Sequence, residues 1–374
     1  MKKFYIFTSL ELDQRNFERF DIKILLNFFD KIEIFYINQD YSFVLDNIFI
    51  NKKIKIHKIN NIFQIIKLHK VKKNSTYIDI LIPGFNTIIC KTILYIKKCK
   101  GIIYQLGNIP IYKKKVRENP NFTFRKVIKF FNTRIFYFLN NQFFKKKNIY
   151  LCAGNKIQNQ YKNYKFIKAH SFDYNEKIKH NKKLVNKKKF FLYLDQYEHD
   201  HPDYNFYGVR KINAENFYNS LNIFFDKLEQ KFKKKIIIAA HPRSKNHSYF
   251  KGRKMIYSKT NELTKNCYAT ISHDSTAISY SIIYKKPIIF IINDEMMRVD
   301  KYKENKIKVF TKELGSSLIN IDKIKNFQSL NNILRKINKK NYNDYYLNYI
   351  NNLKSNKKKI GDIICDIYSG KLSN

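Results

Sequence analysis

Short apolar segments alternate with helical segments along most of this chain, and this alternation restricts the fold more than any other feature. Strands that alternate with helices predict parallel sheets covered by helices on both faces. In the first half, the helical segments are Ile88 to Lys98 and Phe124 to Phe144, where apolar residues recur at helical spacing. The strand-like segments there are Lys3 to Thr8, Ile32 to Ile37, Ile54 to Ile59, Tyr77 to Ile82, Gly101 to Gln105, Asn148 to Ala153 and Tyr164 to Ala169.

A polar, lysine-rich segment from Asn175 to Lys189 lacks core periodicity and marks a linker. Beyond it, helices are expected over Ala214 to Phe232 and Asn261 to Asn266, and strands over Phe190 to Leu194, Ile236 to Ala240, Met255 to Tyr257 and Ala269 to Ile271. A chain of 374 residues is long for one core. We therefore expect an α/β protein with two Rossmann-like domains, residues 1–180 and 189–325, that face a cleft. Helices over residues 326–374 are expected to return towards the first domain.

Two strand-to-helix junctions in the second half carry the residues most suited to bind a ligand. The strand that ends at Ala240 is followed by His241, Pro242 and Arg243, and proline fixes the turn there. The strand that ends at Ile271 is followed by His273, Asp274, Ser275 and Thr276, and then by a helix. Ligands of open α/β sheets bind at the carboxyl ends of the strands, and helix N-termini favour phosphate. We therefore predict that His241, Arg243, Ser275 and Thr276 bind a phosphate group, although helix capping and a solvated loop are simpler explanations of the same residues.

A third cluster follows the first strand of the second half, where Asp195, Glu198, His199, Asp200, His201 and Asp203 lie within nine residues. Transfer to an acceptor hydroxyl needs a group that takes its proton, and a carboxylate or imidazole serves as such a base. Asp195 is the first candidate for this catalytic role and His201 the second. A metal site and a solvated acidic loop are the alternatives, and we expect no metal because nothing fixes a ligand geometry.

The junctions resemble those of bacterial sialyltransferases and related transferases of the GT-B fold. In those families an HP dipeptide after one strand, here His241 and Pro242, and a later hydroxyl pair, here Ser275 and Thr276, bind the phosphate of a CMP-sugar. The resemblance covers residues 189–300 and implies that Glu262 and His273 lie in the donor nucleotide site. The segment from His273 to Phe290 is also similar to CDP-glycerol polyol-phosphate transferases, which supply an alternative donor.

The formal net charge of +43 suggests anionic partners but does not identify one. Lysine far exceeds arginine, and Asn, Ile, Phe and Tyr are abundant, a composition typical of A/T-rich coding rather than of a polyanion site. No nucleic-acid-binding motif accompanies the charge, so we expect no specific nucleic acid partner. A basic surface still attracts an anionic membrane, and the helix expected over Phe124 to Phe144 has aromatic residues and a basic end suited to one.

The five cysteines, Cys90, Cys99, Cys152, Cys267 and Cys365, form no C-x-x-C pair and favour buried, reduced thiols. No apolar run is long enough to span a membrane, and the N-terminal run is interrupted at Glu11. The hypothesis is a glycosyltransferase without a cofactor that moves a sugar from a nucleotide sugar, CMP-linked by preference, to a glycan or lipid-linked glycan acceptor. We expect it in the cytoplasm, at the inner face of a bacterial inner membrane. The alternatives are a polyol-phosphate transferase and a non-catalytic basic protein that binds membrane or nucleic acid.

Overall fold

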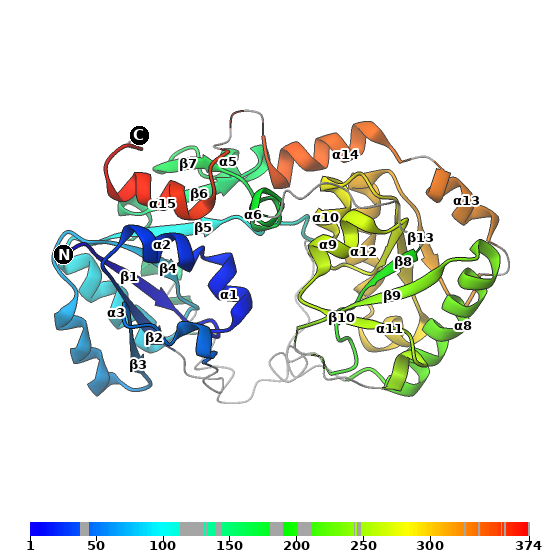
Figure 1. Cartoon of the computed structure of the whole chain (residues 1–374), viewed down its shortest axis with the longest axis horizontal. Coiled ribbons are helices and arrows are strands. Elements are labelled where there is room, and N and C mark those ends of the chain that lie inside the picture. Colours follow the sequence, from blue (N-terminus) through cyan, green and yellow to red (C-terminus); the bar gives the residue numbers. More distant parts are fainter. Residues whose placement is uncertain are drawn as a thin grey trace. The chain divides into compact units, whose positions relative to one another are not determined.

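The structure is a computed structural model that describes most of the chain in two compact units (Figure 1). The described residues are 1–37, 45–112, 131, 134–135, 137–139, 144–179, 190–200, 211–242, 244, 248–324, 327–335, 337–352, 354 and 357–372. Unit 1 comprises residues 1–108, 115–175 and 351–374, and unit 2 comprises residues 109–114 and 176–350. The chain therefore returns to unit 1 after it has completed unit 2.

Unit 1 is built on a sheet of strand order β3-β2-β1-β4-β5-β6-β7 in which every pairing is parallel. Its strands are β1 (Lys3–Thr8), β2 (Lys31–Ile37), β3 (Ile54–Ile59), β4 (Thr76–Ile80), β5 (Lys100–Gln105), β6 (Ile149–Ala153) and β7 (Phe166–Ala169). Its helices are α1 (Gln14–Arg19), α2 (Ile22–Phe28), η1 (Asn47–Phe49), η2 (Ile62–Lys70), α3 (Phe85–Ile96), η4 (Lys145–Lys147), α5 (Asn155–Gln160) and α15 (Ile360–Tyr368). Helix α6 (Phe172–Lys179) spans the boundary between the units.

Strand periodicity divides the core of unit 1 between the two faces of its sheet. In β1, Phe4 and Ile6 face a layer that contains α1, α2 and α15, whereas Tyr5 and Phe7 face a layer that contains η2 and α3. Successive side chains of a strand point to opposite faces, so residues that alternate in one apolar run supply both layers. Continuous apolar strands such as β1 are therefore the mark of a sheet buried on both sides.

Helix α15 is tied into unit 1 by a buried polar network as well as by apolar packing. The Asp21 carboxylate accepts the Gly361 backbone N–H at 2.9 Å and the Asn175 side-chain amide at 3.0 Å. The Asn175 side chain in turn accepts the Ile360 N–H at 3.0 Å. Figure 1 shows α15, in red, beside α2, in dark blue. Gly361 allows this approach, because a Cβ added there would lie 2.8 Å from Asp21 Cβ and 2.9 Å from Ile24 Cβ.

Unit 2 is built on a second all-parallel sheet, of order β10-β9-β8-β11-β12-β13. Its strands are β8 (Phe190–Leu194), β9 (Lys235–Ala240), β10 (Met255–Tyr257), β11 (Ala269–Ser272), β12 (Ile288–Ile292) and β13 (Leu318–Asn320). Its helices are α8 (Ala214–Phe232), η5 (Ser248–Phe250), α9 (Thr260–Asn266), α10 (Ile278–Ile283), α11 (Asp294–Val299), α12 (Lys303–Leu314), α13 (Gln328–Arg335), α14 (Lys339–Tyr345) and the π-helix η6 (Tyr346–Ile350). In chain order the strands run 3-2-1-4-5-6, the order of Rossmann-like dinucleotide-binding sheets.

The fold class expected from the sequence is confirmed as two parallel α/β units, each with helices packed on its sheet. The expected cleft between the two domains stays a prediction. The helix expected over Phe124 to Phe144 falls largely outside the described residues. The five cysteines are buried and form no disulfide, as expected. None of the helices in the described part of the chain has the length and apolar character that a membrane crossing requires.

We predict that Gly361→Ala destabilises unit 1 by about 1–3 kcal/mol, because the new methyl group overpacks the contact between α15 and α2. Gly107→Ala is the matched control, since a Cβ there would lie 3.8 Å from Phe172, an ordinary contact distance. Its effect should stay within about 0.5 kcal/mol. Urea denaturation of both variants measures the difference, and equal stabilities would contradict the close packing of α15.

Candidate functional site

The carboxyl edge of the unit 2 sheet holds most of the residues singled out in the sequence. The strand order reverses direction between β8 and β11, the point at which open α/β sheets form a ligand crevice. Asp195 follows β8, His241 follows β9, and His273 follows β11. These three loops therefore belong to neighbouring strands and emerge at one edge.

Asp195 fastens the loop after β8 to the loop after β9. One carboxylate oxygen accepts the Tyr197 N–H at 3.0 Å and the other accepts the His241 N–H at 3.1 Å. Burial of the side chain raises the pKa of Asp195 to about 6, although these two backbone donors favour the charged form. A carboxylate with a pKa near neutrality can accept a proton and release it again, so the environment suits a general base.

His273 is a buried anchor of the loop after β11. It is fully buried, and both ring nitrogens have partners inside unit 2. Nδ1 lies 2.8 Å from the Ile291 carbonyl oxygen, so this nitrogen donates a hydrogen bond. Nε2 lies 3.0 Å from the Tyr193 oxygen and can accept a hydrogen bond from that hydroxyl. Burial lowers the pKa of His273, so the neutral ring fits this pair of bonds. The ring thus joins the ends of β8, β11 and β12.

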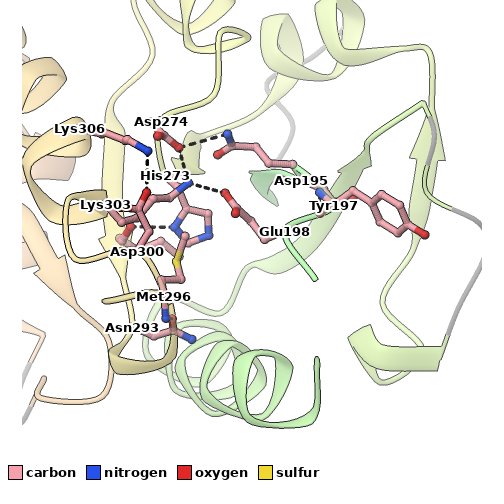
Figure 2. Close-up of polar contacts among 12 residues, drawn as sticks. Asp195, Tyr197, Glu198, His273, Asp274, Asn293, Met296, Asp300, Lys303 and Lys306 are labelled. Atoms are coloured by element: carbon pink, nitrogen blue, oxygen red, sulfur yellow. Dashed lines mark hydrogen bonds and ion pairs between the residues drawn. The ribbon is translucent and has the colours of Figure 1, made fainter. Parts of the chain in front are cut away.

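Figure 2 shows a buried ion cluster that joins two of these loops to helix α12. The Lys303 ammonium donates to Glu198 at 2.7 Å and to Asp274 at 2.8 Å. The Gln196 side-chain amide donates to the same Asp274 oxygen at 3.2 Å. Lys303 opens α12, where the helix dipole disfavours a cation, so the two carboxylates have to outweigh both that dipole and the burial.

The pKa directions agree with a charged cluster. Burial opposes ionisation of Asp274, but the nearby Lys303 ammonium prevails and lowers the pKa of this carboxyl. Burial likewise opposes the charge on Lys303, and Asp274 and Glu198 together raise its pKa. The ammonium is already matched by two carboxylates, so it is not available to neutralise a phosphate. Any anion at this edge has to find its donors on other residues of these loops.

The remaining candidates occupy different surroundings. Ser275 is buried and its hydroxyl accepts the Ala277 N–H at 3.3 Å, while Thr276 is exposed. Both precede α10, which begins at Ile278, so they lie in the turn before the helix rather than in its first turn. Glu262 is exposed in the first turn of α9. His201 and Arg243 lie outside the described residues.

His241 and Ser275 approach the same edge from strands on either side of β8. The order β9-β8-β11 places two strand spacings, about 10 Å, between the ends of β9 and β11. The His241 ring is partly exposed and nearly parallel to Tyr197, with 6.3 Å between the ring centroids. A phosphate held by both loops must therefore lie over the end of β8, with the two side chains reaching towards it. The sharing of one phosphate stays a prediction.

Lys303 is the prominent residue that the sequence interpretation missed. It lies 29 residues after Asp274 and 105 after Glu198, in a helix that the sequence analysis did not identify. A lone lysine in a lysine-rich chain carries no signal of burial. Among the described residues, no group of three or more His, Cys, Asp or Glu side chains is arranged to hold a metal ion.

Comparison with known proteins identifies the architecture. No protein-family model matches the chain, and no curated protein matches its sequence significantly. Among solved structures, UDP-GlcNAc 2-epimerase from Methanocaldococcus jannaschii is 16% identical, with a TM-score of 0.53 over 98% of this chain and 99% of that one. The H444N variant of the wall teichoic acid polymerase TagF is 12% identical, with a TM-score of 0.54 over 99% of this chain and 88% of that one. MnaA of S. aureus, solved with UDP, is 12% identical, with a TM-score of 0.53 over 100% and 98%. At these identities the likeness concerns the fold, and it agrees with the GT-B-like class.

We predict that Lys303→Met destabilises the protein by about 3–5 kcal/mol at neutral pH, because the buried Glu198 carboxylate and the largely buried Asp274 carboxylate lose their counter-ion. In the wild type, Asp274 has a lowered pKa, so its pairing stabilises the fold above the ordinary Asp pKa and is lost as the pH falls. In the variant the Gln196 hydrogen bond still favours the charged form, but burial is no longer opposed by the ammonium, so the pKa of Asp274 rises relative to the wild type and the carboxylate takes up a proton more readily on acidification. The loss should therefore shrink between neutral pH and about pH 4.

The matched control is Lys306→Met, which breaks the more exposed pair of Lys306 with Asp300 at 2.6 Å. That change should cost less than about 1 kcal/mol and depend little on pH. Urea denaturation across this pH range measures both variants. Equal losses would contradict the assignment of Lys303 as the buried counter-ion.

Proposed function

We propose that this protein is a transferase that moves a sugar from a nucleotide-sugar donor to a glycan acceptor, with the donor bound by unit 2. The observation that carries the proposal is the carboxyl edge of β8, β9 and β11, where Asp195, His241 and Ser275 follow adjacent parallel strands. This edge is the ligand-binding edge of Rossmann-like sheets. The fold likeness to proteins solved with UDP-GlcNAc and UDP, and to a teichoic acid polymerase, supports a nucleotide-linked donor.

In this proposal the donor phosphate is bound by His241, Arg243, Ser275 and Thr276, and Glu262 contacts the nucleotide. Imidazole, guanidinium and hydroxyl groups donate hydrogen bonds to phosphate oxygens and stabilise the charge of the leaving group. His273 takes a supporting role, because its buried ring holds the loop that carries Ser275. The cluster of Lys303, Glu198 and Asp274 keeps the same loop rigid.

Asp195 is the proposed general base, with His201 as the second candidate. Its buried carboxyl has a pKa of about 6, which places it mostly in the charged form at neutral pH. The acceptor, a glycan or lipid-linked glycan, would be bound by the domain of residues 1–180, and the donor by residues 189–325. We place the reaction in the cytoplasm, at the inner face of a bacterial inner membrane, where surface glycans such as capsule or lipo-oligosaccharide are assembled.

A polyol-phosphate transferase is the second candidate function. The H444N variant of TagF soaked with CDPG has a TM-score of 0.52 against this chain. The similarity of the segment from His273 to Phe290 to CDP-glycerol polyol-phosphate transferases also favours this function. A CDP-linked donor would use the same phosphate-binding loops. Product analysis separates the two reactions, since only the polyol-phosphate transferase adds phosphorus to the acceptor.

The first experiment is a thermal-shift screen with CMP, CDP, UDP and GDP. A nucleotide present at a hundredfold its Kd should stabilise the protein by about 2.7 kcal/mol. A non-catalytic basic protein would instead show no saturable nucleotide effect, only a weak effect that salt removes. A flat response to all four nucleotides would contradict the proposal.

We predict that His241→Ala lowers the transfer rate at least about tenfold, because it removes one donor to the phosphate. Stability should hardly change, since the backbone N–H of residue 241, which the substitution keeps, makes the bond to Asp195. Initial rates with the donor found in the screen, together with thermal denaturation, make the test. A stable variant with the wild-type rate would contradict the proposed role of His241 in phosphate binding.

If Asp195 is the base, the rate should rise as the pH rises through about 6 and level off above it, because the carboxyl must lose its proton to act. Asp195→Asn should abolish both the rate and this step. If the wild-type rate does not change across pH 6, Asp195 is not the general base, and His201 is the next candidate to test.

A further inference from the structure

Helices η2 and α3 form one layer on unit 1 and run side by side in the same direction. At their starts, the Asn86 side chain donates to the Asn60 carbonyl at 3.5 Å. At their ends, the Lys97 ammonium donates to the carbonyls of Leu68, His69 and Val71 at 2.7–3.1 Å. The inner sides of both helices pack on the sheet through residues such as Leu68 and Leu94. Their outer sides are therefore two adjacent, parallel stripes of surface.

Both outer stripes are apolar where a surface helix is ordinarily polar. In η2, a 3₁₀ helix, residues three apart lie above one another, and Phe63 and Ile66 are 85% and 75% exposed. In α3, Phe85 and Ile96 are exposed at 50% and 70% and lie on one stripe with Thr92. We call the outer stripes of η2 and α3 the apolar face of unit 1.

The surroundings of the apolar face are basic and almost devoid of carboxylates. Between Asn47 and Arg117 the sequence contains one acidic residue, Asp79. That carboxylate is buried and paired with Lys91 at 2.7 Å, so it does not offset the surface charge. On the side of the sheet that carries η2 and α3, the exposed lysines are Lys55 of β3, Lys70 of η2, and Lys72, Lys73 and Lys98 beside these helices.

We propose that the apolar face of unit 1 docks on an anionic lipid bilayer, with Phe63 and Ile66 entering the boundary of the acyl chains and the lysines contacting head groups. Apolar side chains combined with a basic surround are the pattern of surfaces that lie in a membrane interface. A second copy of this chain fits poorly, because its lysines would face these lysines. Nucleic acid would use the charge but would leave the aliphatic side chains of Ile66 and Ile96 without a partner.

The chain contains no tryptophan, so a single introduced tryptophan reports on this surface alone. Phe63→Trp should show a blue-shifted emission when vesicles of phosphatidylglycerol and phosphatidylcholine are added, and no shift with phosphatidylcholine alone. Ile223→Trp is the control, since residue 223 is 45% exposed on α8 of unit 2. An unshifted Phe63→Trp spectrum, or equal shifts in the two variants, would overturn the proposal.

Sedimentation with the same vesicles tests the energetic role of the face. The double variant Phe63→Ser with Ile66→Ser should lose at least about tenfold in vesicle affinity, while Ile223→Ser binds like the wild type. Thermal denaturation verifies folding, which exposed positions should preserve. The proposal fails if the double variant binds vesicles normally, if it loses only binding to a single-stranded oligonucleotide, or if it converts a wild-type dimer to a monomer. Vesicle binding is measured without nucleotide, so its failure is distinct from failure of the donor site.

Discussion

The parallel direction of every strand pairing in the two sheets is the constraint on which the rest of the structure depends. Parallel strands need a crossover after each strand, and each crossover starts at the same edge of its sheet. Polar residues that end one strand therefore lie beside those that end its neighbours, however far apart they are in the chain. Asp195 and His241 are 46 residues apart, and yet the carboxylate of one accepts the N–H of the other.

This edge of unit 2 contains more charge than a protein interior tolerates without pairing, and the pairing determines its chemistry. The Lys303 ammonium pairs with the Glu198 and Asp274 carboxylates, so its charge is used inside the protein and a bound anion needs other donors. Among the described residues, the groups that lower the pKa of Asp195 are backbone N–H donors, and burial outweighs them and raises that pKa. Two carboxylates close in sequence thus have different surroundings, since Glu198 pairs with the Lys303 ammonium and Asp195 accepts two backbone N–H groups.

Long apolar strands and the long amphipathic helix could be predicted from the sequence because their signal lies within the element itself. Strand β1 and helix α8 have the bounds expected from periodicity. Helices α1 and α2 were missed, since six or seven residues make too few turns to show a period. The strand-end position of His273 was predictable, but its burial was not, because the Tyr193 hydroxyl that satisfies its ring lies 80 residues away. Lys303 gave no local signal, since only the tertiary structure brings its partners together.

The attachment of α15 to unit 1 has a consequence for how the chain folds as it is synthesised. Ile360, Ile363 and Ile364 complete the same core as Phe4 and Ile22, yet they follow every element of unit 2 in the chain. During synthesis, unit 2 has all of its residues before unit 1 does. One layer of the unit 1 sheet therefore stays incomplete until α15 has been synthesised, and the apolar surface exposed meanwhile is prone to aggregation.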